Sequence, residues 1–150
     1  MDLVKLNAWG LRAGGLAPRD PAAYSIFGDP VSAPCSGTVV QALDGLADLS
    51  PPQIDREHMA GNHVLLECGD VWVLLGHFQE GSVRVREGDA VKVGQELGRV
   101  GNTGNTDEPH LHVHAQRAGT TEAPLGGDPL PIRLDGRYLA RNARIGGGRP

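Results

Sequence analysis

The stretch from Asn62 to Phe78, NHVLLECGDVWVLLGHF, decides the fold. It contains two apolar runs, NHVLLEC and VWVLLGHF, which are separated by a Gly-Asp pair of the kind that joins hairpin strands. Their almost continuous Val and Leu content predicts strands that are buried on both faces. Because side chains alternate along a strand, Val73, Leu75 and His77 should share one face. We therefore expect His77 to end an apolar row and to be buried.

The flanking segments continue the strand pattern. Upstream, PVSAP (30–34) and GTVVQAL (37–43) predict two short strands, and DLSPPQIDREHMAG (48–61) predicts a surface loop. Downstream, SVRVREGDAVKVGQELGRVG (82–101) alternates Val with Arg or Lys, which is typical of half-buried strands. With 22 Gly, 11 Pro and 4% aromatic residues, the composition favours short strands and tight turns over helices. We expect an all-β fold.

Size and charge limit the possible classes of protein. A chain of 150 residues is long enough for one domain with its own core. Its net charge of -4 provides no basic field for nucleic acid or an anionic membrane, so we expect neither partner. The sequence shows no secretion signal and no apolar run long enough to insert into a membrane. We expect an irregular segment over 1–27, a core over 28–118 and an Arg-rich extension over 119–150.

The two cysteines, Cys35 and Cys68, are too few for a disulfide scaffold. They also lack the close pairing of a zinc knuckle. Their sequence context favours two buried thiols over one disulfide between strands.

The stretch EPHLHVHAQ (108–116) places His110, His112 and His114 at every second position. In a strand these side chains lie on one face, about 6.5 to 7 Å apart at Cα, so two rings can reach one small site. A polar loop, GNTGNTDEP (101–109), precedes them, and loops of this kind line clefts. His77 is a further candidate because a buried imidazole needs a partner. For His114 we expect a flanking position, for His63 a local hydrogen bond, and for both His58 and His63 a place outside the site.

Three stretches, in this order, resemble the lysostaphin-type (LytM-like) zinc endopeptidases: GDPVSAPCSGTVV, GNHVLLECGD, and the run from LLGHF to HLHVH. Together they cover most of residues 28–114. The resemblance implies an antiparallel, sandwich-like duplicated hybrid motif with an open groove. It also implies a zinc cofactor and cleavage of peptide bonds in peptidoglycan cross-links or Gly-rich peptides, which are then the expected partners of a monomer. Carried over, His112 is a zinc ligand, and His77 and His110 position the attacking water and the developing oxyanion.

The family also has an early His-x-x-x-Asp motif that supplies two zinc ligands. Its usual spacing would place them at Pro18 and Ala22, which do not bind metal. We therefore align Asp2 with the acidic end of the motif, expect its His upstream of Met1, and expect an insertion that runs to about Phe27. This chain should then bind zinc weakly and turn over slowly or not at all, whereas a version extended upstream should be active. We expect a periplasmic or extracellular protein if an export signal lies upstream, and a cytoplasmic one if Met1 is the true start.

Three alternatives remain at this point. The first is a catalytically inactive LytM-like module that binds cell-wall peptides or regulates another hydrolase. The second is a biotinyl or lipoyl carrier, which would need Lys92 as its modified residue. The third is a phosphocarrier domain that uses His77 and His110 as a facing pair. The Gly/Asn loop followed by His-x-His favours the peptidase.

Overall fold

The chain is almost entirely β-structured, as expected. The computed structural model describes residues 1–120, 122–134 and 136–145. One short 3-10 helix, Pro21–Ala23, accompanies the strands. The strands are β1 (Asp2–Leu3), β2 (Pro30–Ser32), β3 (Gly37–Leu43), β4 (Asn62–Cys68), β5 (Val71–Phe78), β6 (Ala90–Val91), β7 (Glu96–Arg99), β8 (Leu111–Gln116) and β9 (Pro129–Leu130).

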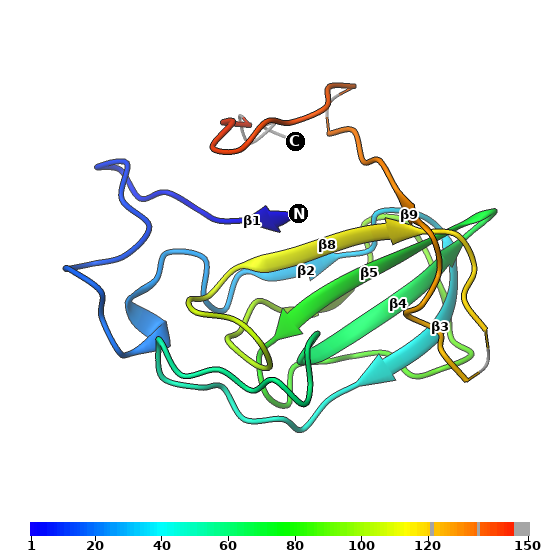
Figure 1. Ribbon diagram of the computed structural model, residues 1–150, viewed down its shortest axis with the longest axis horizontal. Coiled ribbons are helices and arrows are strands. Elements are labelled where there is room, and N and C mark those ends of the chain that lie inside the picture. The colour runs from blue at the N-terminus through cyan, green and yellow to red at the C-terminus, as the bar shows by residue number, and fades with distance from the viewer. Residues whose placement is uncertain (121, 135, 146–150) are drawn as a thin grey trace.

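The strands form two antiparallel sheets (Figure 1). The larger sheet has the order β1-β8-β5-β4-β3-β6, and β9 pairs with the end of β8. The smaller sheet consists of β2 and β7. β4 and β5 pair as the hairpin that the sequence predicts, with Cys68 opposite Val71 at the turn. The all-β, antiparallel, sandwich-like fold is therefore confirmed.

The main core lies between the two sheets. Val31 of β2 and Leu97 of β7 are 2% and 0% exposed, and they belong to the same apolar cluster as Val64 of β4 and Leu75 of β5. The other buried members of this cluster are Ile26, Ala33, Val39, Leu66, Phe78, Val85, Val91 and Val100. Leu65, on the other face of β4, is also buried. Burial of this strand on both faces is thus confirmed.

The segment 82–101 follows the expected burial pattern but only part of it forms strands. Val85 is buried and Val83 half-buried, whereas Arg84 and Arg86 are exposed. However, residues 82–86 carry no strand, and only β6 and β7 are regular. The alternation of Val and Arg fixes which side chains face the core, but the ladder hydrogen bonds depend on a neighbouring strand that is absent along most of this segment.

The two cysteines form a disulfide, so the expectation of two thiols was wrong. Neither cysteine is fully buried. β3 and β4 pair with Thr38 opposite Glu67, which places Cys35, just before β3, near Cys68 at the end of β4. The Cα atoms lie 5.9 Å apart, within the range that a disulfide spans.

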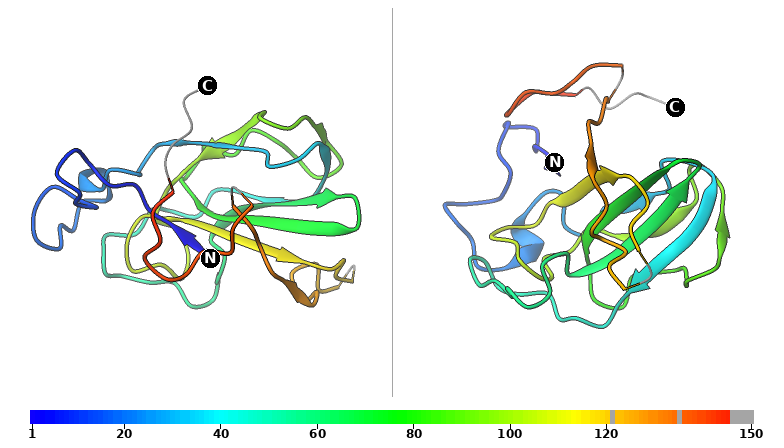
Figure 2. Two further views of the ribbon diagram at one scale, coloured as in Figure 1. Left: turned by 90° about the horizontal axis from the view of Figure 1, so that it is seen from above. Right: turned by 45° about the vertical axis from the view of Figure 1, so that its right-hand side comes forward.

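Two short strands, β1 and β9, form the edge of the large sheet beside β8. β1 pairs with the start of β8 and β9 with its end, while β5 occupies the other side of β8. Between β1 and β2 the chain makes a long excursion, which projects from one end of the sheets in both views of Figure 2. Among the described residues, no helix has the length and apolar character to cross a membrane.

Candidate metal and catalytic site

His77 reaches the site through a β-bulge. The register between β4 and β5 shifts between the pairs Val64–Leu75 and Asn62–Phe78, so β5 has one more residue than β4 over this interval. His77 has a φ of 62°, in the left-handed region that side chains rarely adopt. Leu75 and Phe78 both enter the core as a result. The expectation that His77 shares the face of Leu75 was therefore wrong, because the extra residue turns it to the opposite face.

On that opposite face the imidazole rings of His77, His110 and His112 converge, and we call these three residues the histidine cluster. The ring centroids of His77 and His110 are 4.7 Å apart, those of His77 and His112 are 5.8 Å apart, and those of His110 and His112 are 6.5 Å apart. One ring nitrogen from each lies within 4.8 Å of the others. On the opposite side of β8, Leu111 and Val113 pack against the core, as the alternation predicts.

Asp2 adds a carboxylate to the histidine cluster. Its position follows from strand pairing, because Asp2 lies opposite His112 in the β1–β8 ladder. Asp2 Oδ1 is 2.8 Å from His112 Nδ1 and 3.5 Å from His110 Nε2. The ladder continues at Met1, whose amine donates to Val113 O at 2.9 Å and whose carbonyl accepts from Val113 N at 2.8 Å. The structure thus brings together all four residues that the sequence singled out.

Main-chain carbonyls orient two of the imidazoles. His77 Nδ1 lies 2.7 Å from Thr103 O and His110 Nδ1 lies 2.9 Å from Glu108 O. Since a carbonyl can only accept, both Nδ1 atoms carry the proton, and each Nε2 keeps a lone pair. Thr106 Oγ1, 3.1 Å from His110 Nδ1, adds a polar contact. The sequence had indicated only a polar loop here and not these supports.

Thr103 also ties the loop before β8 to the central hairpin. Its hydroxyl accepts from Asn62 N at 2.9 Å and donates to Phe78 O at 2.9 Å. Thr103 and Asn62 are both 0% exposed. The 101–109 loop is further bonded to the 44–61 loop through Asn102, which accepts from Leu49 N at 3.0 Å and donates from Nδ2 to Leu49 O at 2.7 Å. The supports of His77 are therefore held on several sides.

Burial controls the protonation of the site. Burial, with a further contribution from His110, lowers the pKa of His77 to about 4. Burial also lowers the pKa of His112, although its hydrogen bond to Asp2 opposes the shift. For Asp2, burial raises the pKa, but the hydrogen bond to His112 and the charge of His110 outweigh it and bring the pKa below its ordinary value. These shifts favour neutral rings for His77 and His112 beside the Asp2 carboxylate.

These donors fit a zinc ion chemically. Zinc in proteins is bound by imidazole nitrogen, carboxylate oxygen and thiolate sulfur, and catalytic sites keep a position open for water. Here the carboxylate of Asp2 and the ring of His112 are already within 2.8 Å of each other. One ring nitrogen from each residue of the histidine cluster lies within 4.8 Å of the others, so the cluster alone could also hold a metal ion.

The other histidines lie outside the cluster. His58 Nδ1 lies 2.7 Å from Asp55 Oδ2, and His63 Nδ1 lies 2.7 Å from Gly61 O. His114 stacks on His112 with ring centroids 6.4 Å apart. The local hydrogen bond expected for His63 and the flanking position expected for His114 are thus seen in the structure, and His58 has a local partner as well.

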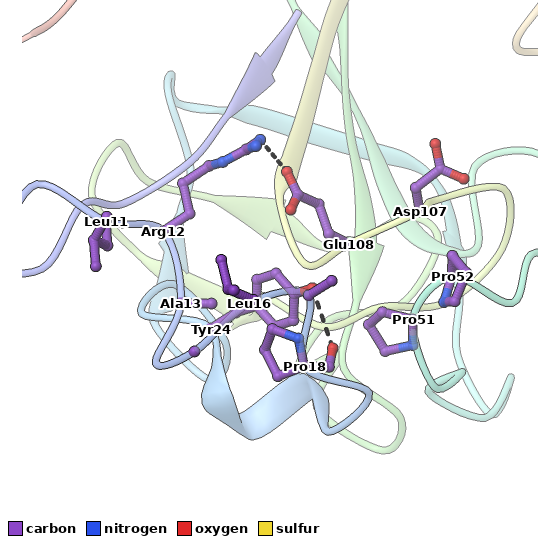
Figure 3. Close-up of a pocket in the computed structure, with 12 residues that line it drawn as sticks. Leu11, Arg12, Ala13, Leu16, Pro18, Tyr24, Pro51, Pro52, Asp107 and Glu108 are labelled. Carbon is purple, nitrogen blue, oxygen red and sulfur yellow. Dashed lines mark hydrogen bonds and ion pairs between the residues drawn. The ribbon is translucent and has the colours of Figure 1, made fainter.

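A pocket of about 580 Å³ lies next to the site. It is walled by the excursion between β1 and β2, by Pro51 and Pro52, and by Asp107 and Glu108 just before β8 (Figure 3). We call it the N-terminal pocket. Arg12 forms an ion pair with Glu108 at its edge. The resemblance implied an open groove, whereas a wall from the N-terminal segment was not expected.

Comparison with known proteins identifies the family. The sequence pattern of peptidase family M23 matches residues 22–124, which is more than half of the chain. The chain belongs to peptidase family M23. This places it in the metalloendopeptidase class and confirms the resemblance to the lysostaphin-type enzymes.

Individual relatives are similar over the same region. A lipoprotein NlpD/LppB homologue of Pseudomonas aeruginosa is 36% identical over 100 residues, which are 66% of this chain and 29% of that protein. Endolysin 2638A of a Staphylococcus phage is 33% identical over 94 residues, which are 62% of this chain and 17% of that protein. The chain thus spans less than a third of the length of these curated relatives.

Solved structures agree on the fold. A catalytic-domain variant of the prophage-encoded M23 protein EnpA from Enterococcus faecalis has a TM-score of 0.54 and 26% identity, covering 87% of this chain and 84% of that one. The antimicrobial peptidase lysostaphin from Staphylococcus simulans has a TM-score of 0.50 and 25% identity, covering 75% of this chain and 45% of that one.

Proposed function

We propose that this chain is a zinc-dependent endopeptidase that hydrolyses peptide bonds in peptidoglycan cross-links or Gly-rich peptides. The observation that carries the proposal is the convergence of the histidine cluster and the Asp2 carboxylate. Four groups from β1, β5 and the β8 region meet on the face of the sheet that does not pack against the main core. A purely structural role would not require three imidazoles with their ring nitrogens within 4.8 Å of one another.

Asp2 and His112 are the residues of this chain that would hold the zinc, and because two protein ligands are fewer than the usual three we expect the binding to be weak. When bound, zinc supplies a Lewis acid that polarises the scissile carbonyl and a water whose pKa is about 7. The ladder between β1 and β8 sets Asp2 directly opposite His112, so these two donors need no large rearrangement. The neutral state of His112 favours binding, since a protonated imidazole nitrogen cannot be a ligand.

His77 and His110 would position the attacking water and the developing oxyanion. The fixed tautomers leave Nε2 of both rings available, because each Nδ1 donates to a carbonyl. His77 accepts a hydrogen bond from water but holds a proton poorly, since its pKa is lowered to about 4. We therefore assign to His110 the transfer of the proton from the attacking water to the leaving amine.

The relatives support this substrate class. An endolysin and the antimicrobial peptidase lysostaphin are among the similar proteins. The alternative of an inactive module is not favoured, because Asp2, His77, His110 and His112 are all present and close together. The carrier alternatives are not supported either, because family M23 matches the region that contains Lys92.

We further propose that the protein acts in an oxidising compartment, the periplasm or the cell exterior. The disulfide between Cys35 and Cys68 supports this location, since structural disulfides persist there and are rare in the cytosol. Peptidoglycan also lies outside the cytoplasmic membrane. Thiol alkylation of the protein in intact cells, followed by mass measurement, tests the location: alkylated cysteines would contradict it.

Zinc content and peptide cleavage test the activity. The 150-residue chain is purified and assayed for zinc by elemental analysis, then for cleavage of purified peptidoglycan and of pentaglycine. We expect a chelator to abolish cleavage and added zinc to restore it.

We expect His112→Ala to lower kcat/KM by about 100-fold or more. The matched control is His114→Ala, on the same face of β8 but outside the histidine cluster, which should retain activity within about threefold. Equal losses in both variants would contradict the proposed site.

A further inference from the structure

The N-terminal pocket is built largely from residues outside the part of the chain that matches family M23. Family similarity begins at residue 22, whereas Leu11, Arg12, Leu16 and Pro18 line the pocket. These residues belong to the excursion that projects from one end of the sheets (Figure 2). Most of the pocket lining thus lies outside the part of the chain that the family pattern matches.

The walls of the pocket are mainly apolar. Leu16 is fully exposed and Leu11 is 55% exposed, although both are large hydrophobic side chains. Across the pocket stand Pro51 and Pro52 (Figure 3). Tyr24 closes the base, and its hydroxyl donates to Pro18 O at 3.2 Å, so it offers mainly its ring to an occupant. Exposed apolar groups that gather around one hollow are typical of a binding surface.

The pocket lining contains two carboxylates and one guanidinium group, so the charge of one carboxylate is not balanced within the lining. Arg12 is neutralised by its ion pair with Glu108. Asp107 also lines the pocket and is exposed, and no ion pair of Asp107 occurs within the described part of the chain. The lining residues therefore carry a net charge of -1. An occupant with an aliphatic body and a positive end matches both the walls and this charge.

The pocket adjoins the histidine cluster through Glu108. Glu108 lines the pocket and its carbonyl oxygen accepts from His110 Nδ1 at 2.9 Å. Two residues of extended chain span about 7 Å, so Glu108 places the pocket within one or two peptide residues of the cluster. This separation suits a neighbouring residue of a bound peptide.

We propose that the N-terminal pocket is a substrate subsite for a peptide side chain that has an aliphatic body and a terminal ammonium group, as lysine does. The proposal rests on the proposed function, because it takes the occupant to be the substrate peptide. It names Leu16 as the apolar contact and Asp107 as the charge contact. It therefore assigns part of the sequence preference to a segment outside the family match.

Calorimetric binding of two synthetic peptides tests the proposal. They are acetyl-Gly-Gly-Lys-Gly-Gly-amide and the same peptide with norleucine, which keeps an aliphatic chain but lacks the charge. A chelator is present so that neither peptide is cleaved. We expect the Lys peptide to bind about threefold tighter than the norleucine peptide. Asp107→Asn should remove this difference, and Leu16→Ser should weaken both peptides by about threefold to fivefold.

Matched controls come from the far side of the molecule. Asp70→Asn changes an exposed carboxylate at the β4–β5 turn, and Val93→Ser changes a side chain that is 64% exposed. Both should bind the two peptides as the wild type does. Equal affinity of wild type for the two peptides, a Lys preference that survives Asp107→Asn, or no effect of Leu16→Ser would each overturn the proposal. Cleavage assays with zinc separate the two hypotheses: a Lys preference in binding without hydrolysis of either peptide would reject only the endopeptidase activity.

Discussion

Substituting Thr103 by Val tests whether the loop before β8 holds the site together. Valine has nearly the same shape but lacks the hydroxyl. The change leaves the buried Asn62 N–H without its acceptor at 2.9 Å and removes the donor to Phe78 O. It also loosens the segment whose carbonyl orients His77.

The expected loss follows from these contacts. A net hydrogen bond contributes about 1 kcal/mol, and a buried donor left without an acceptor costs about 1 to 3 kcal/mol. Phe78 O retains a second contact from Asn62 Nδ2 at 3.3 Å, so its loss is smaller. We expect the free energy of unfolding to fall by about 2 to 4 kcal/mol, which a domain of ordinary stability survives.

Urea unfolding followed by circular dichroism measures this loss. The matched control is Thr38→Val, at an exposed position of β3, which should change the free energy of unfolding by no more than about 0.5 kcal/mol. We also expect Thr103→Val to lower kcat/KM under conditions where the protein is fully folded. If both variants unfold at the same urea concentration, the hydroxyl is not the structural link inferred here.

Three further predictions concern stability. Gly61→Ala should cost about 3 kcal/mol or more and Gly69→Ala only about 1 kcal/mol, because both glycines have positive φ but only at Gly61 would a Cβ collide with a backbone carbonyl. Replacing Cys35 and Cys68 together by Ser should cost about 3 to 4 kcal/mol, since the disulfide closes a separation of 33 residues. Burial lowers the pKa of His63 below 6.5, so its neutral form is favoured in the fold, and stability should fall as the pH drops below about 6.5.

Each of these has its own check. Thermal or urea unfolding of the two glycine variants side by side shows whether crowding or backbone conformation dominates, and equal losses would reject the crowding. Reduction of the wild type should reproduce the loss in the double Ser variant. For His63, the difference in unfolding free energy between pH 7.5 and pH 5 should be smaller in His63→Gln than in the wild type. An unchanged difference would show that another group causes the acid sensitivity.

Much of the fold could be predicted because its signals are local. The β4–β5 hairpin was visible as two apolar runs about a Gly-Asp pair, and the alternation in β8 put His110 and His112 on the face away from the core. The disulfide was missed because its cysteines are 33 residues apart and meet only through the pairing of β3 with β4. Spacing along the chain contains no information about that register.

The site, too, could be predicted where its signals are local and not where they depend on strand pairing. Candidate side chains could be chosen from their chemistry, but the direction of His77 depends on a bulge that exists only relative to β4. Its supports at Thr103 and Glu108 are main-chain carbonyls, which every residue has, so no residue type marks them. The N-terminal pocket was missed because residues 11–18 have no periodicity, and their walls form only against distant prolines.

Because β1 is short, the Asp2 carboxylate should move more readily than the three imidazole rings. β1 is two residues long and lies at an edge of the sheet, whereas β5 is paired on both sides. Short edge segments fray with little free energy, so Asp2 should detach and return while the three rings stay in place. Amide hydrogen exchange at Val113, whose N–H is bonded to Met1 O, would report this opening directly. Metal affinity would then depend partly on how often β1 is paired with β8.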